Sequence, residues 1–320
     1  MQIDIVTVFP EMIAAALDHS IVKRAMERGL VSIRVVNLRD YTEDKHRKTD
    51  DMPYGGGGGM VMQIGPIARA VFDLRGTNES GHESDSESFT AKSATIISET
   101  DSSGVPSTRQ GAENVSAAPV PRIVITDPRG PKFTQETARK WAKEPHLILL
   151  CGHYEGVDER VRRHLVTDEI SIGDYILTGG ELPALVITDA LTRLQAGALG
   201  DSEAPDKDTF TENLLEYPHY TRPRDYNGWA APDVLVNGHH ALIERWRRWH
   251  QLRDTQQRRP DLFATLTLSE QDLILLRSDE PMAPSDLKVL RSRKKGAKPR
   301  DEAPTKEEEN GPDETGDSGH

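Results

Sequence analysis

The stretch LILLCGHYEG, residues 147–156, decides the fold class of this chain. Its first five residues form an unbroken apolar run, which is typical of a strand buried on both faces, and its last five form a turn bounded by glycines. Similar strands are predicted at 3–9, 31–38, 123–126 and 169–172. Because segments with helical spacing separate them, the chain is predicted to have an α/β fold with a mostly parallel sheet covered on both faces.

Apolar residues at helical spacing link the predicted strands. They predict one helix over 12–26 that ends at Gly29, a residue suited to the left-handed position after a helix. Further helices are predicted at 64–73, 133–143 and 182–195. After residue 214 the strand-like runs end, and helical patterns at 241–255 and 269–277 predict a small α-helical second domain.

Polar segments set the expected domain boundaries. Residues 76–119 are rich in Ser, Thr and Glu without periodicity, and are predicted to be a disordered insertion in an α/β domain spanning 1–198. A polar, acidic linker is expected at 199–213, the helical domain at 214–278, and a disordered charged tail at 279–320.

The negative charge is concentrated in two of these segments. Residues 76–119 hold seven acidic and two basic residues, and residues 301–320 hold eight acidic residues and one lysine. They account for the whole formal charge of −12, so the rest of the chain is formally neutral. The acidic total therefore does not exclude a nucleic-acid partner, and basic patches have to be judged locally.

Composition also bounds the cellular setting. Cys151 is the single cysteine, so no intrachain disulfide can form, as expected in a reducing cytoplasm. No apolar run approaches the roughly 18 residues that a membrane-spanning helix needs. The first residues, MQIDIVTVFPE, lack a basic leader and do not resemble a signal peptide. We therefore expect a cytoplasmic protein without a membrane partner.

Four glycine-rich turns are candidates for a binding pocket. They are PYGGGGGM at 53–60, DPRGP at 127–131, CGHYEG at 151–156 and IGDYILTGGELP at 172–183. Two of the last three directly follow predicted strands, and ligands of open α/β sheets bind beyond the carboxyl ends of the strands. A pocket built largely from backbone N–H and C=O groups would suit a purine.

The glycine run at 55–59 has other interpretations when it is taken alone. A lone run of glycines is more often a flexible linker. The run also lacks the Lys-Ser/Thr of a phosphate-binding loop. The three companion turns favour a pocket wall instead.

Five long motifs, in order, resemble the bacterial tRNA (guanine-N1-)-methyltransferase family, the TrmD family of the SPOUT class. They are NLRDYTEDKHRKTDD with PYGGGGGMVM, CGHYEGVDERV, SIGDYILTGGELPALVITDALTR, EYPHYTRP and LVNGHHALIERWR. The resemblance covers residues 1 to about 75 and about 120 to about 275. Neither 76–119 nor the last forty or so residues has a counterpart in the family core.

The resemblance implies a homodimer whose α/β domain carries a deep trefoil knot, a rare exception to the rule that chains do not thread loops. The knot of this family binds S-adenosylmethionine. The matching positions in this chain are Thr126, Asp127, Pro128, Gly152, Tyr154, Gly156, Ile172, Gly173, Asp174, Tyr175, Ile176, Leu177, Gly179, Gly180 and Pro183. By residue type alone, Asp127 is only a turn former before a proline.

The implied methyl acceptor is N1 of the guanosine immediately 3′ to the anticodon, a modification that supports reading-frame maintenance. Removing the N1 proton needs a base, the charge growing on O6 needs a cation, and the guanine has to leave its stack. Asp208 matches the family's proposed base and Arg193 its O6-stabilising cation. Glu155 matches a carboxylate near the guanine and is a candidate Mg²⁺ ligand.

The same resemblance expects the active site at the subunit interface, with Arg193 and Glu155 from one subunit and Asp208 from the other. Without it, Asp208 is one acid among several in a polar segment, and Arg193 is a cation at the end of a helix.

Two further segments are expected to contact tRNA. Pro53, Tyr54, Gly55, Gly56 and Gly57 would contact the flipped guanine. On the basic segment 239–260, Arg245, Arg247 and Arg248 are candidates for phosphate contacts. We expect Trp246 and Trp249 to be core residues rather than base-stacking ones.

His153 stands where the family commonly has Arg, and Thr209 where it has Ser. Two other functions are open to such a chain. A non-catalytic RNA-binding protein could keep the fold, although the presence of Asp208, Arg193 and Glu155 argues against it. A nucleotide hydrolase could use the glycine loop, but the missing phosphate-loop lysine argues against that.

Overall fold

The computed structural model describes residues 1–76, 120–201 and 208–281. The chain divides into two compact units, Met1–Lys207 and Asp208–His320. The division falls inside the segment 199–213 that the sequence predicts to be a linker. The insertion, apart from Gly76, and most of the tail lie outside the described residues.

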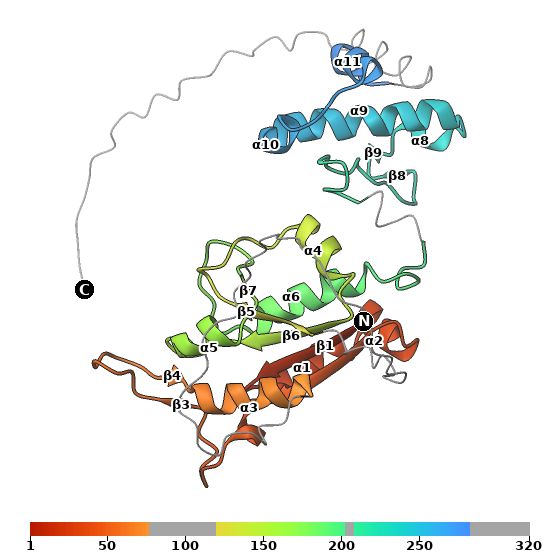
Figure 1. Cartoon of the computed structure of the whole chain (residues 1–320). Helices are drawn as coiled ribbons and strands as arrows, with labels where there is room; N and C mark the ends of the chain where they lie inside the picture. Colours follow the sequence, from red (N-terminus) through yellow and green to blue (C-terminus); the bar gives the residue numbers. More distant parts are fainter. Residues whose placement is uncertain (77–119, 202–207, 282–320) are drawn as a thin grey trace, which may run out of the picture. The chain divides into compact units, whose positions relative to one another are not determined.

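A five-stranded sheet forms the centre of the first unit (Figure 1). Its strands are β1 (Gln2–Thr7), β2 (Ser32–Asn37), β5 (Arg122–Thr126), β6 (His146–Cys151) and β7 (Asp168–Ile170), in the order β2-β1-β6-β5-β7. Every neighbouring pair is parallel. The predicted α/β fold with a mostly parallel sheet is confirmed.

Helices cover both faces of this sheet (Figure 1). On one face, α1 (Pro10–Leu17), α2 (Ser20–Glu27), α4 (Gln135–Trp141) and α6 (Glu181–Thr192) pack on a core that includes Ile3, Ile5, Leu147 and Leu149. On the other, α3 (Ile64–Arg75) and α5 (Glu159–His164) pack on Val6, Ile125 and Ile148. Successive strand residues point to opposite faces, so unbroken apolar runs supply both cores.

The single helix predicted over 12–26 was wrong. The chain forms α1 and α2 instead, separated at Asp18 and at His19, which has an extended backbone. Both helices bury apolar residues in the same core, so the apolar spacing continues through the break. Gly29 does take the left-handed conformation after α2, with φ of +69°.

A short hairpin extends from the first unit (Figure 1). Its strands β3 (Asp50–Asp51) and β4 (Val61–Met62) are antiparallel and are joined by the glycine run. The 3-10 helix η1 (Leu38–Tyr41) precedes it. Strands this short give no periodic signal, which is why the sequence did not predict them.

The second unit contains α8 (Asp233–Val236), α9 (His240–Arg258), α10 (Pro260–Phe263) and α11 (Glu270–Arg277), with a two-stranded sheet of β8 (Asp225–Tyr226) and β9 (Trp229–Ala230). Leu214, Leu252 and Leu275 form its small core. Trp246 is buried, as expected, and donates from Nε1 to Glu280 Oε1 at 2.7 Å. Glu280 thus packs with this unit, although its position in a polar segment placed it in the tail.

Candidate functional site

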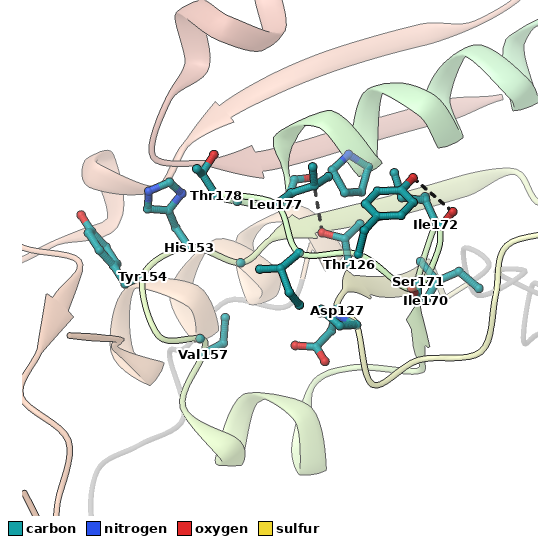
Figure 2. A pocket seen from close by; sticks show the side chains of 18 of the residues that line it. Thr126, Asp127, His153, Tyr154, Val157, Ile170, Ser171, Ile172, Leu177 and Thr178 are labelled. Carbon is teal, nitrogen blue, oxygen red and sulfur yellow. Dashed lines mark hydrogen bonds between the residues drawn. The ribbon is translucent and has the colours of Figure 1, made fainter. Parts of the chain in front are cut away.

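A cavity of about 300 Å³ lies at the carboxyl ends of β5, β6 and β7. Its walls are three of the predicted glycine turns (Figure 2). Of the fifteen positions expected to bind the cofactor, all but Asp174 line it. The Asp174 carboxylate instead pairs with Lys132 Nζ at 2.6 Å and is largely exposed. The rule that ligands bind beyond strand ends therefore located a real cavity.

Six lining residues were not among the candidate site residues, although His153 and Thr178 lie within the predicted turns. The six are His153, Val157, Arg162, Ile170, Ser171 and Thr178. Val157 and Ile170 could have been anticipated as neighbours of the turns, but Arg162 could not. It lies on α5, whose sequence ERVRRH is mostly charged. Such a helix shows no apolar periodicity from which a buried residue could be predicted.

Close packing of backbone shapes the cavity beside the start of α6. The Gly180 N–H donates to the Gly152 carbonyl at 2.7 Å, so the turn before α6 rests directly on the turn after β6. A Cβ built on Gly180 would lie 2.2 Å from Thr126 Oγ1 and 2.8 Å from both Cys151 Cα and Gly152 N. The backbone can come this close only where residue 180 has no side chain.

His153 and Glu181 lie where the cavity meets α6. The His153 ring packs edge-on against Phe9, with ring centroids 4.8 Å apart, and its Nδ1 lies 3.8 Å from Glu181 Oε2. Glu181 is buried and accepts a hydrogen bond from Thr7 Oγ1 at 2.8 Å. His153 therefore contacts a buried carboxylate and an aromatic ring of its own unit.

Glu155 lines the cavity and is fixed by the hairpin. Its backbone N–H donates to the Met60 carbonyl at 3.0 Å, and Met62 N donates to the Gly156 carbonyl at 2.9 Å. The residues expected to contact guanine, Pro53 to Gly57, do not line the cavity. They occupy the tip of the hairpin, where Tyr54 is 99% exposed. Their contact with guanine stays a prediction.

Arg193 lies far from this cavity within the chain. It follows the last residue of α6, whereas the cavity lies at the first turn of that helix. Twelve helical residues separate the two ends by roughly 18 Å. Arg193 lines a different cavity, of about 420 Å³, with Arg139 and Lys143. One chain therefore does not bring Arg193 to Glu155, contrary to the expected grouping of these two residues from one subunit.

Comparison with known proteins matches the family described as tRNA (Guanine-1)-methyltransferase TrmD to residues 1–101 and 105–265. That match covers most of the chain. This chain belongs to the TrmD family.

Curated relatives support the same membership, and three of them illustrate it, each named tRNA (guanine-N(1)-)-methyltransferase. The protein of Halalkalibacterium halodurans is 48% identical over 278 residues, which cover 87% of this chain and 97% of the relative. That of Brevibacillus brevis is 46% identical over 271 residues, covering 85% and 95%. That of Desulforamulus reducens is 41% identical over 292 residues, covering 91% and 100%.

The TrmD match also corrects the expected extent of the resemblance. It runs through most of 76–119, which we expected to have no counterpart.

In the second unit of this TrmD-family chain, the three candidate arginines differ in their surroundings. Arg245 is exposed. Arg247 pairs with Glu244 Oε1 at 2.7 Å and lies over the Tyr217 ring. Arg248 makes two hydrogen bonds to Asp272, at 2.8 and 3.1 Å, and a third to Glu212. Arg248 thus holds α9 to α11, which leaves Arg245 the most accessible of the three for a phosphate.

The Asp272 carboxylate should make the second unit sensitive to acid. The hydrogen bonds from the Arg248 guanidinium lower the pKa of Asp272 from 3.8 to about 2. Burial raises this pKa, but hydrogen bonds from Ser269 add to the lowering. A lowered pKa in the folded state stabilises at pH values above the unfolded pKa, and this contribution is lost as the pH falls from about 4 towards 2. We expect Asp272→Asn to lower the free energy of unfolding by about 2 kcal/mol at pH 7.

Chemical denaturation at several pH values measures this. The gap between wild type and Asp272→Asn should close between about pH 4 and pH 2. Asp261→Asn, which removes an exposed pair with Arg259, is the matched control and should change little. A gap that persists at pH 2 would contradict the assignment to this ion pair.

Gly180→Ala should distort the cavity. The new Cβ would overlap the backbone of Cys151 and Gly152, which cannot move without shifting β6, so we expect a loss of at least about 2 kcal/mol in the stability of the first unit. Gly152→Ala is the control, because its Cβ would meet Val157 at an ordinary 3.5 Å. Thermal unfolding of both variants measures the difference, and equal melting temperatures would argue against this steric account.

Proposed function

We propose that this chain is a tRNA methyltransferase that transfers a methyl group from S-adenosylmethionine to N1 of the guanosine immediately 3′ to the anticodon. The observation that carries the proposal is the cavity at the strand ends, lined by the glycine turns that match the TrmD family. The modification would help to maintain the reading frame, in the cytoplasm. No helix in the described part of the chain could span a membrane.

The lining of the cavity fits S-adenosylmethionine. Backbone groups of the glycine turns can bind the edge of an adenine, and Ile170, Ile172 and Leu177 supply apolar surface for its faces. Asp127 adds a negative charge to the wall: burial raises its pKa, but hydrogen bonds from Arg129 N–H and the Arg162 guanidinium outweigh this and lower it. When bound, S-adenosylmethionine supplies the electrophilic methyl group. We propose that the segment around this cavity forms the trefoil knot.

Three residues of the chain would act on the guanine. Asp208 would take the N1 proton as a general base. Arg193 would place its guanidinium beside O6, where negative charge grows as N1–H is lost. Glu155 would accept hydrogen bonds from the guanine edge and hold the base against the cofactor.

A protein-only Mg²⁺ site does not fit the described residues. Among them, no group of three or more His, Cys, Asp or Glu side chains could hold a metal ion. Mg²⁺ bound at Glu155 would therefore need further ligands, such as water, RNA or groups of the partner subunit.

The exposed face of α6 supports a homodimer. Phe9, Met12 and Leu182 are exposed apolar residues that line one shallow cavity between the starts of α1 and α6. Val186, one turn along α6, is also exposed, and Arg193 follows on the same side of the helix at i+11 from Leu182. Clustered exposed apolar side chains of this kind mark an interface.

A two-fold dimer formed through this face would account for the distance between Arg193 and the cavity of its own chain. In a two-fold dimer, an antiparallel second α6 would bring Arg193 of the partner subunit towards the cavity. We propose that Glu155 and the cofactor belong to one subunit, and that Arg193 comes from the other. Asp208 would also come from the partner subunit, through the second unit.

A methylation assay tests the function. The purified protein, S-adenosylmethionine and a tRNA transcript should yield 1-methylguanosine at the anticodon-adjacent position, detected by mass spectrometry of nuclease digests. A transcript with adenosine at that position should not be methylated. Tight tRNA binding without methylation would indicate a non-catalytic RNA-binding protein. Methylation at another guanosine would refute the proposed position.

A further inference from the structure

A cluster of charged side chains occupies one wall of the cavity. Arg162, whose side chain is only 5% exposed, contacts the Asp127 carboxylate through Nη2. Its Nη1 lies 3.2 Å from Glu169 Oε2, and its Nε lies 3.7 Å from Glu159 Oε2. Arg129 donates its backbone N–H to Asp127 Oδ1 at 2.8 Å, and its side chain pairs with Asp127 and Glu159. The cluster comprises three carboxylates and two guanidinium groups.

The cluster as a whole carries one net negative charge, and Asp127 and Arg162 are the two of its members that line the cavity. Asp127 lines the cavity directly, beneath Thr126 (Figure 2). Its Oδ1 accepts from both the N–H and the Nε of Arg129, and its Oδ2 accepts from Arg162 Nη2 and can accept one more hydrogen bond, since a carboxylate has about four lone-pair sites. The wall is therefore suited to a ligand group that is positively charged and donates hydrogen bonds.

One donor of Arg162 is also unsatisfied. Its Nε is buried and makes no hydrogen bond to any described residue. It faces Glu159 Oε2 at 3.7 Å, so the cationic side of the cluster is already opposed by a carboxylate. An α-ammonium group is a cation with three N–H donors, so it would complement the remaining acceptor site of Asp127.

We propose that Asp127 binds the α-ammonium group of the methionine portion of S-adenosylmethionine, and that Arg162 is a positioning residue that fixes the Asp127 carboxylate. This inference rests on the proposed function, because it takes S-adenosylmethionine as the ligand. Fixing the carboxylate in advance lowers the cost of ordering it on binding. Arg162 thus affects the ligand through Asp127 and does not contact it directly.

Two ligands that share the adenosine part test the proposal by calorimetry. S-adenosylhomocysteine keeps the amino-acid end, and 5′-methylthioadenosine lacks it. Asp127→Asn, which preserves the shape of the side chain, should weaken S-adenosylhomocysteine about 10- to 100-fold, as expected for loss of a charge-assisted hydrogen bond. The affinity for 5′-methylthioadenosine should change by no more than about twofold.

Variants of α5 test the positioning role. Arg162→Met should give the same selective loss, and Arg162→Lys, which keeps a charged donor, should recover part of the affinity. In steady-state kinetics Arg162→Met should raise the KM for S-adenosylmethionine with kcat unchanged at saturation. Arg163→Met is the matched control, since Arg163 is 71% exposed on the same helix and pairs with the same Glu159.

Four results would overturn the proposal. Equal weakening of both ligands would place the contact at the adenosine end or indicate a general structural effect. Weakening of S-adenosylmethionine but not of S-adenosylhomocysteine would assign the contact to the sulfonium. No change with Asp127→Asn would exclude a role for this carboxylate. If the wild type binds none of the three ligands, the proposed function itself fails and the inference fails with it.

Discussion

Asp208→Ala should lower kcat for tRNA methylation by about 10²- to 10⁴-fold, the usual contribution of a positioned general base. The guanine N1 proton is only weakly acidic, so without a base the nitrogen lacks an available electron pair when the methyl group arrives. Asp208 begins the second unit, and its carbonyl accepts the Thr211 N–H at 3.2 Å, which places it in a turn. The KM for S-adenosylmethionine should stay within about twofold, because the base is not expected to contact the cofactor.

The neighbouring acid provides the control. Asp206→Ala removes a carboxylate two residues earlier and should leave kcat unchanged. If Asp208→Ala retains wild-type methylation, Asp208 is not the base. Loss of activity in Asp206→Ala alone would move the assignment to that residue.

Mixing two inactive variants should restore activity. Arg193→Ala and Glu155→Ala should each be nearly inactive as homodimers. In a mixed dimer, one site combines the intact Glu155 of one subunit with the intact Arg193 of the partner subunit, while the other site has lost both. Random exchange of equal amounts makes half the dimers mixed with one working site each, so we expect about one quarter of wild-type activity.

This experiment separates the two arrangements of the site. If Arg193 and Glu155 acted from the same subunit, every site in a mixed dimer would lack one of them, and activity would stay near zero. The helix α6 makes that outcome unexpected, since its first turn borders the cavity that Glu155 lines, whereas Arg193 follows its last residue. Co-expression with two affinity tags isolates the mixed dimer. The double variant Arg193→Ala/Glu155→Ala paired with wild type is the reciprocal control: its mixed dimer has no intact site if the two residues come from different subunits, and one intact site if they come from the same subunit.

Strands and turns that recur in the same pattern along the chain could be predicted from the sequence. Buried parallel strands such as β6 are continuous apolar runs, and the turns that follow them carry the glycines, so both the sheet and most of the cavity wall could be located. The break between α1 and α2 could not, because the helices share one core and their spacing agrees across it.

Charged contacts were the least predictable part. Arg162 and Arg248 look alike in sequence to Arg163 and Arg247, yet the first two are held by acids distant in the chain, Asp127 and Asp272. Which arginine of a basic run is buried depends on the partner that folding brings to it. Tertiary packing, and not residue type, decides whether such a cation faces a ligand, a phosphate or another helix.

Backbone hydrogen bonds connect the hairpin to a turn that lines the cavity. The base of the hairpin is bonded to the turn after β6 at three points, from Glu155 N to Met60 O, from Met62 N to Gly156 O, and from Asp158 N to Met62 O. A ligand that orders this turn also restrains the hairpin. By reciprocity, an RNA that binds the exposed tip of the hairpin orders the turn. The free-energy cost of ordering this region would then be met once for both substrates. Binding of either one would therefore increase the affinity for the other.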